Sequence, residues 1–259
     1  MYPQFEIFSV TIYSFWIALS LAFVLFFWML YRLSLKYWIN TNFFLNNIFF
    51  YFISIFFFSR LFYILAEWRE FKHIFNEWFF KFFFMSDYNF SLIWWIVGFM
   101  IVMYFKIKKY KLKSEKYIDA AVLAFLFAAI IWYIWTFLWW QVLWKPTTLP
   151  IWVIYTDPFN KSPFPGPIFP LAIIYSIICF LLFTWLYITR LFIKIEWFVW
   201  YLWIILFCSF LLIFEFFNWQ IDDSFSSYIY LSMTQLWAIW LIIFAARWFS
   251  KIYKQEASA

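Results

Sequence analysis

The chain is 259 residues long, and 68% of its residues are hydrophobic and 32% aromatic, with only two glycines. So much apolar surface excludes a water-soluble globular domain and is typical of a protein embedded in a lipid bilayer. The formal net charge of +6 is best explained by basic segments on one side of that bilayer, and we expect no nucleic-acid partner.

Seven apolar stretches follow one another, and all but the third approach or exceed the roughly 20 residues that cross a hydrocarbon core. Backbone groups in lipid must be satisfied within their own segment, so each stretch is expected to be a helix. The first stretch has no basic leader and no cleavage site, and we expect it to remain in the protein. The sequence therefore predicts an all-α, multi-pass membrane protein with a single domain over residues 1–259 and spans at Ile7–Leu33, Phe43–Ala66, Phe90–Phe105, Ile118–Trp140, Pro170–Ile193, Trp197–Phe217 and Tyr228–Trp248.

Basic residues are distributed unevenly between the two ends of these spans. An outer N-terminus puts thirteen Lys and Arg residues on the inner face and five on the outer face. Because cytoplasmic loops are enriched in Lys and Arg, the sequence predicts an outer N-terminus and an inner C-terminus. The inner set is Arg32, Lys36, Lys106, Lys108, Lys109, Lys111, Lys113, Lys116, Arg190, Lys194, Arg247, Lys251 and Lys254, and the outer set is Arg69, Lys72, Lys81, Lys145 and Lys161.

Three connecting segments have distinct patterns. Residues 67–89 interleave aromatic and charged residues at helical spacing, which predicts an outer segment lying flat at the membrane interface. Residues 145–170 hold seven of the eight prolines and predict an irregular outer loop that acts as a lid or a docking surface. The basic loop over residues 106–116 is expected to lie against anionic lipid headgroups on the inner face.

Three polar residues lie within the predicted spans at a similar depth below the outer surface, namely Arg60, Glu215 and Gln235. Ionisable residues are costly in lipid and are functional candidates by default. One interpretation is a site in which Arg60 binds a phosphate or a lipid headgroup. The other interpretation, which we favour, is an ion pair between Arg60 and Glu215 that locks two helices together.

Residues typical of metal sites and nucleophiles are sparse. His73, the single histidine, shares a helical face with Glu70 and Glu77, a pattern more typical of an ion-pair network than of a metal site. Cys179 and Cys208 fall within spans and are expected to pack as small apolar residues. We expect no metal and no cofactor, and a bound phospholipid is compatible with the composition.

Several short fragments occur in order along roughly residues 5 to 250: Phe8-Ser9, Tyr13-Ser14-Phe15-Trp16, Ser59-Arg60-Leu61-Phe62-Tyr63-Ile64-Leu65, Met85-Ser86, Ile118-Asp119-Ala120, Leu143-Trp144, Phe214-Glu215-Phe216-Phe217 and Ser232-Met233-Thr234-Gln235-Leu236. Together they resemble bacterial prolipoprotein diacylglyceryl transferases. That family has seven spans and an outer N-terminus, and it transfers a diacylglyceryl group from phosphatidylglycerol to the lipobox cysteine of preprolipoproteins. The resemblance implies a location in the bacterial cytoplasmic membrane.

The chain departs from this family at most of its polar positions. The essential His of the family falls near Phe90, its span-four Arg and Asn near Ile134 and Phe137, its Glu near Val142, and its span-six Arg at Leu211. The family motif His-Pro-Ser-Gln-Leu-Tyr-Glu reads Phe164-Pro165-Gly166-Pro167-Ile168-Phe169-Pro170 here. Only Arg60, Glu215 and Gln235 carry over.

These losses bear directly on the reaction that the family performs. Diacylglyceryl transfer needs a base for the cysteine thiol and positive charge for the departing glycerol phosphate, and losing one such group commonly costs about 10²–10⁴ in rate. The sequence therefore predicts no catalytic residue and a catalytically inactive structural or accessory subunit of a larger membrane complex, with membrane lipids and other membrane proteins as partners. The alternatives are a phospholipid- or lipoprotein-binding module that uses Arg60, and a divergent active transferase with Glu215 or Asp223 as base.

Overall fold

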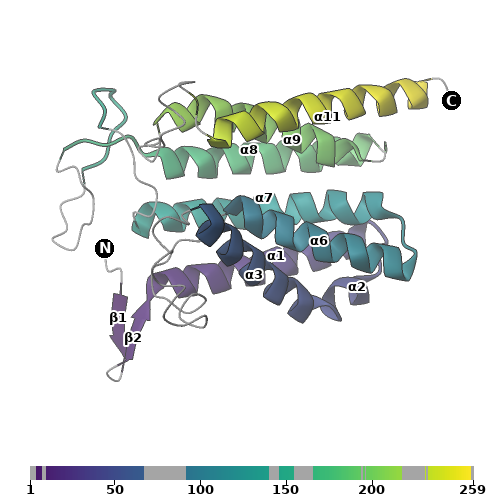
Figure 1. The fold of residues 1–259 in the computed structure, drawn as a ribbon, viewed down its shortest axis with the longest axis horizontal. Helices are drawn as coiled ribbons and strands as arrows, with labels where there is room; N and C mark the ends of the chain where they lie inside the picture. Colours follow the sequence, from purple (N-terminus) through teal and green to yellow (C-terminus); the bar gives the residue numbers. More distant parts are fainter. Residues whose placement is uncertain are drawn as a thin grey trace. The chain divides into compact units, whose positions relative to one another are not determined.

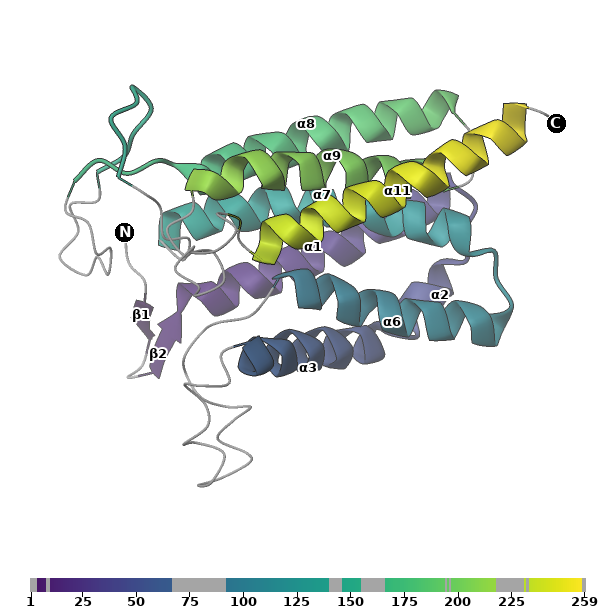
Figure 2. The same cartoon turned by 45° about the horizontal axis from the view of Figure 1, so that its top comes forward.

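The computed structural model describes residues 4–7, 10–66, 92–139, 146–154, 166–193, 195, 197–217, 231 and 233–257. Helices dominate this part of the chain (Figure 1, Figure 2). Its elements in chain order are β1 (Gln4–Ile7), β2 (Val10–Tyr13), α1 (Ser14–Lys36), α2 (Thr41–Leu45), α3 (Ile48–Ala66), α6 (Leu92–Tyr110), α7 (Ser114–Trp139), α8 (Leu171–Phe192), α9 (Phe198–Phe214), the 3-10 helix η2 (Glu215–Phe217) and α11 (Met233–Ala257).

Contacts divide the chain into two compact units. The first comprises Met1–Tyr37 and Glu115–Ala259, and the second comprises Trp38–Ser114. The single domain predicted over residues 1–259 stays a prediction, and the two units are described separately.

A β-hairpin precedes the first long helix. β1 and β2 pair antiparallel, with Ile7 opposite Val10, and α1 begins directly after β2. Val10, Thr11 and Ile12 are three consecutive β-branched residues, whose side chains fit a strand better than a helix. The prediction that the first helix begins at Ile7 is therefore wrong.

Asparagines interrupt the second predicted span, which the structure divides into α2 and α3. The Nδ2 of Asn47 donates to the carbonyl of Phe43 at 2.7 Å, and the side chain of Asn40 accepts the N–H of Asn42 at 3.0 Å. Asparagine side chains that bond to nearby backbone groups compete with the helical ladder and favour helix ends. The prediction of one continuous helix over Phe43–Ala66 is therefore wrong.

The basic segment between the third and fourth spans is mostly helical. α6 continues past its predicted end at Phe105, so basic residues occupy its last turn, and only three residues separate it from α7. Lys111 adopts a φ of 52°, and the N–H of Leu112 bonds to the carbonyl of Ile107 at 3.1 Å, which is a left-handed helix cap. The loop predicted over residues 106–116 is thus two helix ends joined by a tight turn.

Among the described residues, the left-handed backbone conformation occurs at residues with bulky side chains and not at glycine. Trp38, Lys111 and Trp197 have φ values of 55°, 52° and 63°, and each lies at the end of a helix. Glycine is the usual residue at such positions, because a left-handed conformation costs an L-residue roughly 1–2 kcal/mol. With two glycines in 259 residues, this chain accepts that cost at its helix ends.

In the unit Trp38–Ser114, α3 and α6 lie side by side (Figure 2). The contact depends on Gly98 of α6, since a Cβ built there would lie 2.8 Å from the carbonyl oxygen of Ser54 and 3.0 Å from the Cβ of Phe58. The Oγ of Ser54 in turn donates to the carbonyl of Gly98 at 2.7 Å. The absence of a side chain at Gly98 therefore sets the distance between these helices.

In the other unit, α7 is buried over most of its first half. Five alanines of α7 are buried, so small side chains make up much of its buried surface. The Oγ of Ser176 on α8 donates to the carbonyl of Ile130 on α7 at 2.9 Å. The buried alanines are Ala120, Ala121, Ala124, Ala128 and Ala129.

α9 contacts both α8 and α11, and the three helices run side by side (Figure 1). The buried face of α11 consists of the small residues Ala238 and Ala245 and of Gln235. Small residues at such spacing allow close packing of helices, which matches the extensive contact with α9.

Four helices in the described residues are long and apolar enough to cross a membrane, and two more are apolar but shorter. α8 and α9 with η2 reproduce the predicted spans Pro170–Ile193 and Trp197–Phe217 almost residue for residue. α11 begins later than the predicted Tyr228, which lies outside the described residues, and runs past Trp248 to Ala257. The long set is Ile17–Lys36, Ser114–Leu138, Leu171–Phe192 and Gln235–Lys254, and the shorter set is Ile48–Phe58 and Phe198–Phe214.

The two predicted outer segments are described only in part. Residues 67–89 lie outside the described residues. Within 145–170, the described chain is irregular, and Val153 and Ile168 exchange backbone hydrogen bonds at 3.0 and 3.1 Å. Thr147 N–H also donates to the carbonyl of Pro167 at 3.0 Å, so the two ends of this segment are held together.

Replacing Gly98 with Ala is expected to lower the free energy of unfolding by about 1–3 kcal/mol, because the new Cβ overlaps backbone atoms of α3 that cannot turn aside. Thermal unfolding of the purified protein in detergent measures the effect. Gly166→Ala is the matched control, because a Cβ there meets nothing within 4 Å and the φ of Gly166 is not positive. Equal stability of the two variants would show that α3 and α6 do not approach each other at Gly98.

Candidate functional site

Gln235, one of the polar residues singled out in the sequence, joins α11 to α9. Its side chain is fully buried, and its Nε2 donates to the carbonyl of Leu212 at 3.0 Å. Leu212 lies in the last turn of α9, where carbonyl groups lack the usual partners within the helix. Gln235 of α11 therefore supplies a hydrogen-bond donor to a carbonyl group at the end of α9.

Glu215 lies just beyond this contact, as the first residue of η2, and only 8% of its surface is exposed. The buried side chains of Tyr133 on α7 and Tyr175 on α8 are near enough to interact electrostatically with its carboxylate. The two tyrosine rings are 5.2 Å apart. Cys179 is fully buried on α8, one turn after Tyr175.

These five residues form what we call the buried polar cluster: Tyr133, Tyr175, Cys179, Glu215 and Gln235. They come from α7, α8, η2 and α11 of the same unit. Within the described residues, the Tyr175 hydroxyl is buried and has no hydrogen-bond partner. The cluster therefore holds one carboxylate among neutral polar groups.

The third polar residue singled out in the sequence, Arg60, lies in α3 of the other unit. Its side chain is outside the described part of the structure, so the predicted Arg60–Glu215 ion pair stays a prediction. Glu215 and Gln235 do come together, since the acceptor of Gln235 lies one turn before Glu215.

A second buried polar site, which the sequence analysis did not predict, lies at the other end of these helices. Asp119 of α7 and Arg190 of α8 form an ion pair with 3.4 Å between Oδ2 and Nε, and their side chains are 1% and 10% exposed. Asp119 also accepts the backbone N–H of Trp200 through Oδ1 at 3.2 Å. We call these two residues and the backbone groups they bind the Asp119–Arg190 site.

Asp119 takes the place of a missing helix cap. Trp197, the N-cap residue of α9, has a φ of 63° and forms no capping hydrogen bond through its side chain. Trp200 lies in the first turn of α9, where backbone N–H groups lack acceptors within the helix and the helix dipole favours negative charge. The carboxylate of Asp119 supplies both the acceptor and the charge from a different helix.

Arg190 performs the complementary task at the end of α8. Its Nη1 donates to the carbonyls of Ile193 and Ile195 at 3.0 and 3.3 Å, so it holds the connection between α8 and α9. Its guanidinium also lies 6.0 Å from the ring centre of Tyr37, just after α1. Burial raises the pKa of Tyr37 to about 12, so its hydroxyl stays neutral. The positive charge of Arg190 is thus engaged by Asp119, by backbone carbonyls and by an aromatic face.

Sequence signals for the Asp119–Arg190 site exist but are weak. Asp119 lies a few residues inside an apolar helix, and Arg190 lies at the end of the next one, so antiparallel helices place both at the same level. In the sequence, Arg190 is one of thirteen basic residues predicted on the inner face, and Asp119 stands out only within the fragment Ile118-Asp119-Ala120. Which of the inner basic residues meets the aspartate depends on helix packing, which composition does not specify.

The described residues show no metal centre. No three His, Cys, Asp or Glu side chains in this part of the chain come close enough to hold a metal ion. Glu70, His73 and Glu77 lie outside the described residues. Cys179 and Cys208 are both buried and are free thiols.

Removing either partner of the Asp119–Arg190 pair is expected to lower the free energy of unfolding by about 3–5 kcal/mol, because the remaining charge stays buried without its partner. Asp119→Ala and Arg190→Ala, alone and together, are to be compared by thermal unfolding in detergent. The double variant should lose clearly less than the sum of the single variants, since it leaves no lone charge.

Arg32→Ala is the control for this cycle, because Arg32 is an exposed arginine of the same unit that lies 5.6 Å from the ring centre of Trp28. Its loss should change stability by roughly 0.5–1 kcal/mol. Additive effects of Asp119→Ala and Arg190→Ala would contradict direct pairing.

The buried polar cluster and the Asp119–Arg190 site are the two candidate sites of the described chain, and comparison with known proteins adds no assignment to either. The sequence matches no protein-family model and shows no significant similarity to a curated protein. The similarity to prolipoprotein diacylglyceryl transferases therefore rests on the short fragments quoted above and stays a prediction.

Proposed function

We propose that this chain is a catalytically inactive, diacylglyceryl-transferase-like membrane protein that serves as a structural or accessory subunit of a larger membrane complex. The observation that carries the proposal is the use of its buried polar side chains. Three of these side chains bond to backbone groups at helix ends. Asp119 binds at the start of α9, Arg190 just after the end of α8, and Gln235 at the end of α9. Groups engaged in this way stabilise helix ends and are not free to bind a substrate.

The positions at which the resemblance would place catalytic groups support the same proposal. Ile134, near the position of the family's arginine, is an isoleucine with 39% of its surface exposed. Leu211, at the position of a second arginine, is partly buried and apolar. Neither side chain can take a proton from a thiol or neutralise a departing phosphate. Phe90 and Val142 lie outside the described residues.

We also propose that the protein crosses the bacterial cytoplasmic membrane seven times, with an outer N-terminus and an inner C-terminus. Each predicted span overlaps at least one helix of the structure, and four of these helices are long and apolar enough to cross a membrane. α1, α6, α8 and α11 each carry basic residues in the last turn, as expected for helices that end on the inner face. This pattern supports the orientation because alternate helices of a bundle end on the same side.

Mild detergent extraction from native membranes, followed by native mass spectrometry, tests the proposed role. The chain should arrive in a fixed stoichiometry with other membrane proteins. The purified protein should also fail to transfer a radiolabelled diacylglyceryl group from phosphatidylglycerol to a lipobox peptide, with an active prolipoprotein diacylglyceryl transferase as positive control. A chain that arrives alone and carries phospholipid would favour the lipid-binding alternative, and label on the peptide would establish an active transferase.

Labelling of single cysteines tests the proposed orientation. In a Cys179→Ala and Cys208→Ala background, Ile151→Cys and Lys109→Cys place thiols at two exposed positions. A membrane-impermeant maleimide should label residue 151 on intact spheroplasts and residue 109 only after lysis. Labelling of residue 109 on intact spheroplasts would reverse the orientation.

A further inference from the structure

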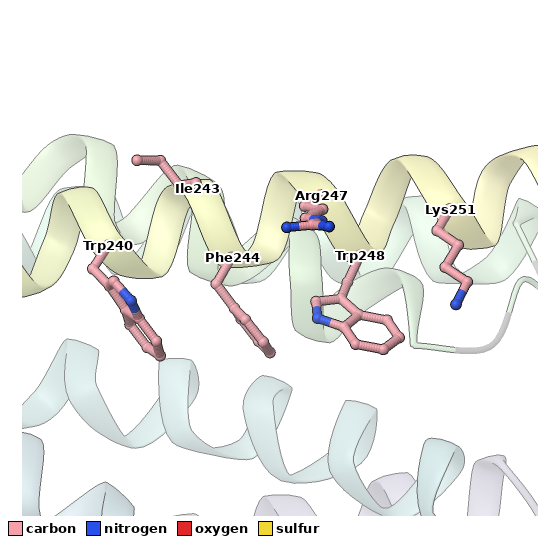
Figure 3. Close-up of a pocket in the computed structure, with 6 residues that line it drawn as sticks. All are labelled: Trp240, Ile243, Phe244, Arg247, Trp248 and Lys251. Atoms are coloured by element: carbon pink, nitrogen blue, oxygen red, sulfur yellow. The ribbon is translucent and has the colours of Figure 1, made fainter.

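α11 packs through one narrow face and leaves the opposite face open. Gln235, Ala238 and Ala245 are buried, whereas Trp240 and Ile243 are 56% and 64% exposed. Figure 3 shows Trp240, Phe244 and Trp248 extending from this helix in the same direction. Their spacing of four residues places them on one face of an α-helix.

The exposed aromatic side chains of α11 form a continuous ladder. The rings of Trp237 and Trp240 are 6.0 Å apart, and those of Phe244 and Trp248 are 6.2 Å apart. In the middle, Trp240 and Phe244 stack at 5.6 Å with only 10° between their planes. Such a ladder offers a long, flat apolar surface parallel to the helix axis.

Two basic residues lie at the C-terminal end of the same ladder. A hollow of about 440 Å³ is lined by Trp240, Ile243, Phe244, Arg247, Trp248 and Lys251. The Nζ of Lys251 is 5.0 Å from the ring centre of Trp248, so the positive charge of Lys251 lies beside the hollow. Arg247 and Lys251 are exposed, and neither forms an ion pair with any residue that the structure describes.

We propose that this face of α11 binds one anionic phospholipid, with its phosphate on Arg247 and Lys251 and an acyl chain along Trp240, Phe244 and Trp248. The charges are complementary, because a guanidinium and an ammonium group face a phosphodiester that carries the opposite charge. The apolar part matches as well. Trp240 and Lys251 are separated by eleven residues, or roughly 16 Å along the helix, which is close to half of a hydrocarbon core of about 30 Å.

A lipid suits this face better than a helix of another protein does. Helix contacts within membranes favour small residues, and the six residues that line the hollow include none. A protein helix would need both an acidic residue beside Arg247 and Lys251 and an apolar face that fits the aromatic ladder. A phospholipid brings its negative charge and its apolar chain in one molecule.

The site does not depend on the proposed role in a larger complex or on the proposed orientation. It requires only that α11 lies in a bilayer with its C-terminal end at a headgroup layer. The test can therefore use the purified chain alone, and its outcome is independent of co-purifying proteins.

The experiment is native mass spectrometry of the purified protein with an equimolar mixture of palmitoyl-oleoyl phosphatidylglycerol and palmitoyl-oleoyl phosphatidylcholine. The wild-type protein should retain one phosphatidylglycerol in preference to phosphatidylcholine. The double variant Arg247→Ala/Lys251→Ala should lower that retention by about tenfold, because each basic contact contributes a severalfold preference for an anionic lipid. The charge-preserving variant Arg247→Lys/Lys251→Arg should restore most of it.

Arg32→Ala/Lys36→Ala is the matched control, because it removes two exposed basic residues near the C-terminal end of α1 and changes net charge equally. It should leave the retained phosphatidylglycerol unchanged. Equal loss of phosphatidylglycerol in both double variants would show that only a general attraction between opposite charges is at work, and it would contradict the proposed site. A dimer that persists with added lipid and disappears in Trp240→Ala/Trp248→Ala would instead assign this face to a second copy of the chain.

Discussion

The carboxylate of Asp119 is the point on which the larger unit depends. It lies near the beginning of α7, pairs with Arg190 at the end of α8 and accepts the N–H of Trp200 in the first turn of α9. Water is absent from the interior of a bilayer, so a helix end buried there needs a partner from the protein itself. Here Asp119 accepts a backbone N–H at the start of α9, and Arg190 donates to backbone carbonyls after the end of α8. The two side chains also neutralise each other's charge. The cost of burying each charge is offset only while both are present.

The same constraint explains the opposite end of the bundle. Gln235 reaches from α11 to the carbonyl of Leu212, where α9 gives way to η2. An amide is a suitable group for this task, because it donates a hydrogen bond without bringing a charge. α9 is therefore held at both of its ends by side chains of other helices. At the beginning of α9, Trp197 makes no capping bond through its side chain, so the acceptor comes from α7.

The scarcity of glycine affects where helices can approach and how they end. Gly98 is the one place in the described residues where glycine permits a close helix contact, and elsewhere alanines and serines take that role. Helix ends that would usually carry glycine carry Trp38, Lys111 or Trp197. Large aromatic residues then fill the remaining surface, and on α11 they produce a ladder that ends at two cations.

The helical class and the bounds of the most regular helices follow from local sequence patterns, because long apolar runs and the prolines and charges that end them act locally. The limits of α8 and α9 were predictable for this reason. Local preferences also explain the two wrong predictions of helix bounds. β-Branched residues favour a hairpin at the start of the first predicted span, and asparagine side chains that bond to the backbone divide the second.

Which polar groups meet depends on how the helices pack against one another. Glu215 and Gln235 were identifiable as polar residues in apolar helices, but their partners were not, and the pairing of Arg60 is a matter of helix packing that its sequence position does not specify. Asp119 and Arg190 are 71 positions apart in the chain, and nothing local to either distinguishes Arg190 from the other basic residues near helix ends. Their pairing arises from the antiparallel packing of α7 and α8, which brings the beginning of one helix to the end of the other and places a buried charge within reach of its partner.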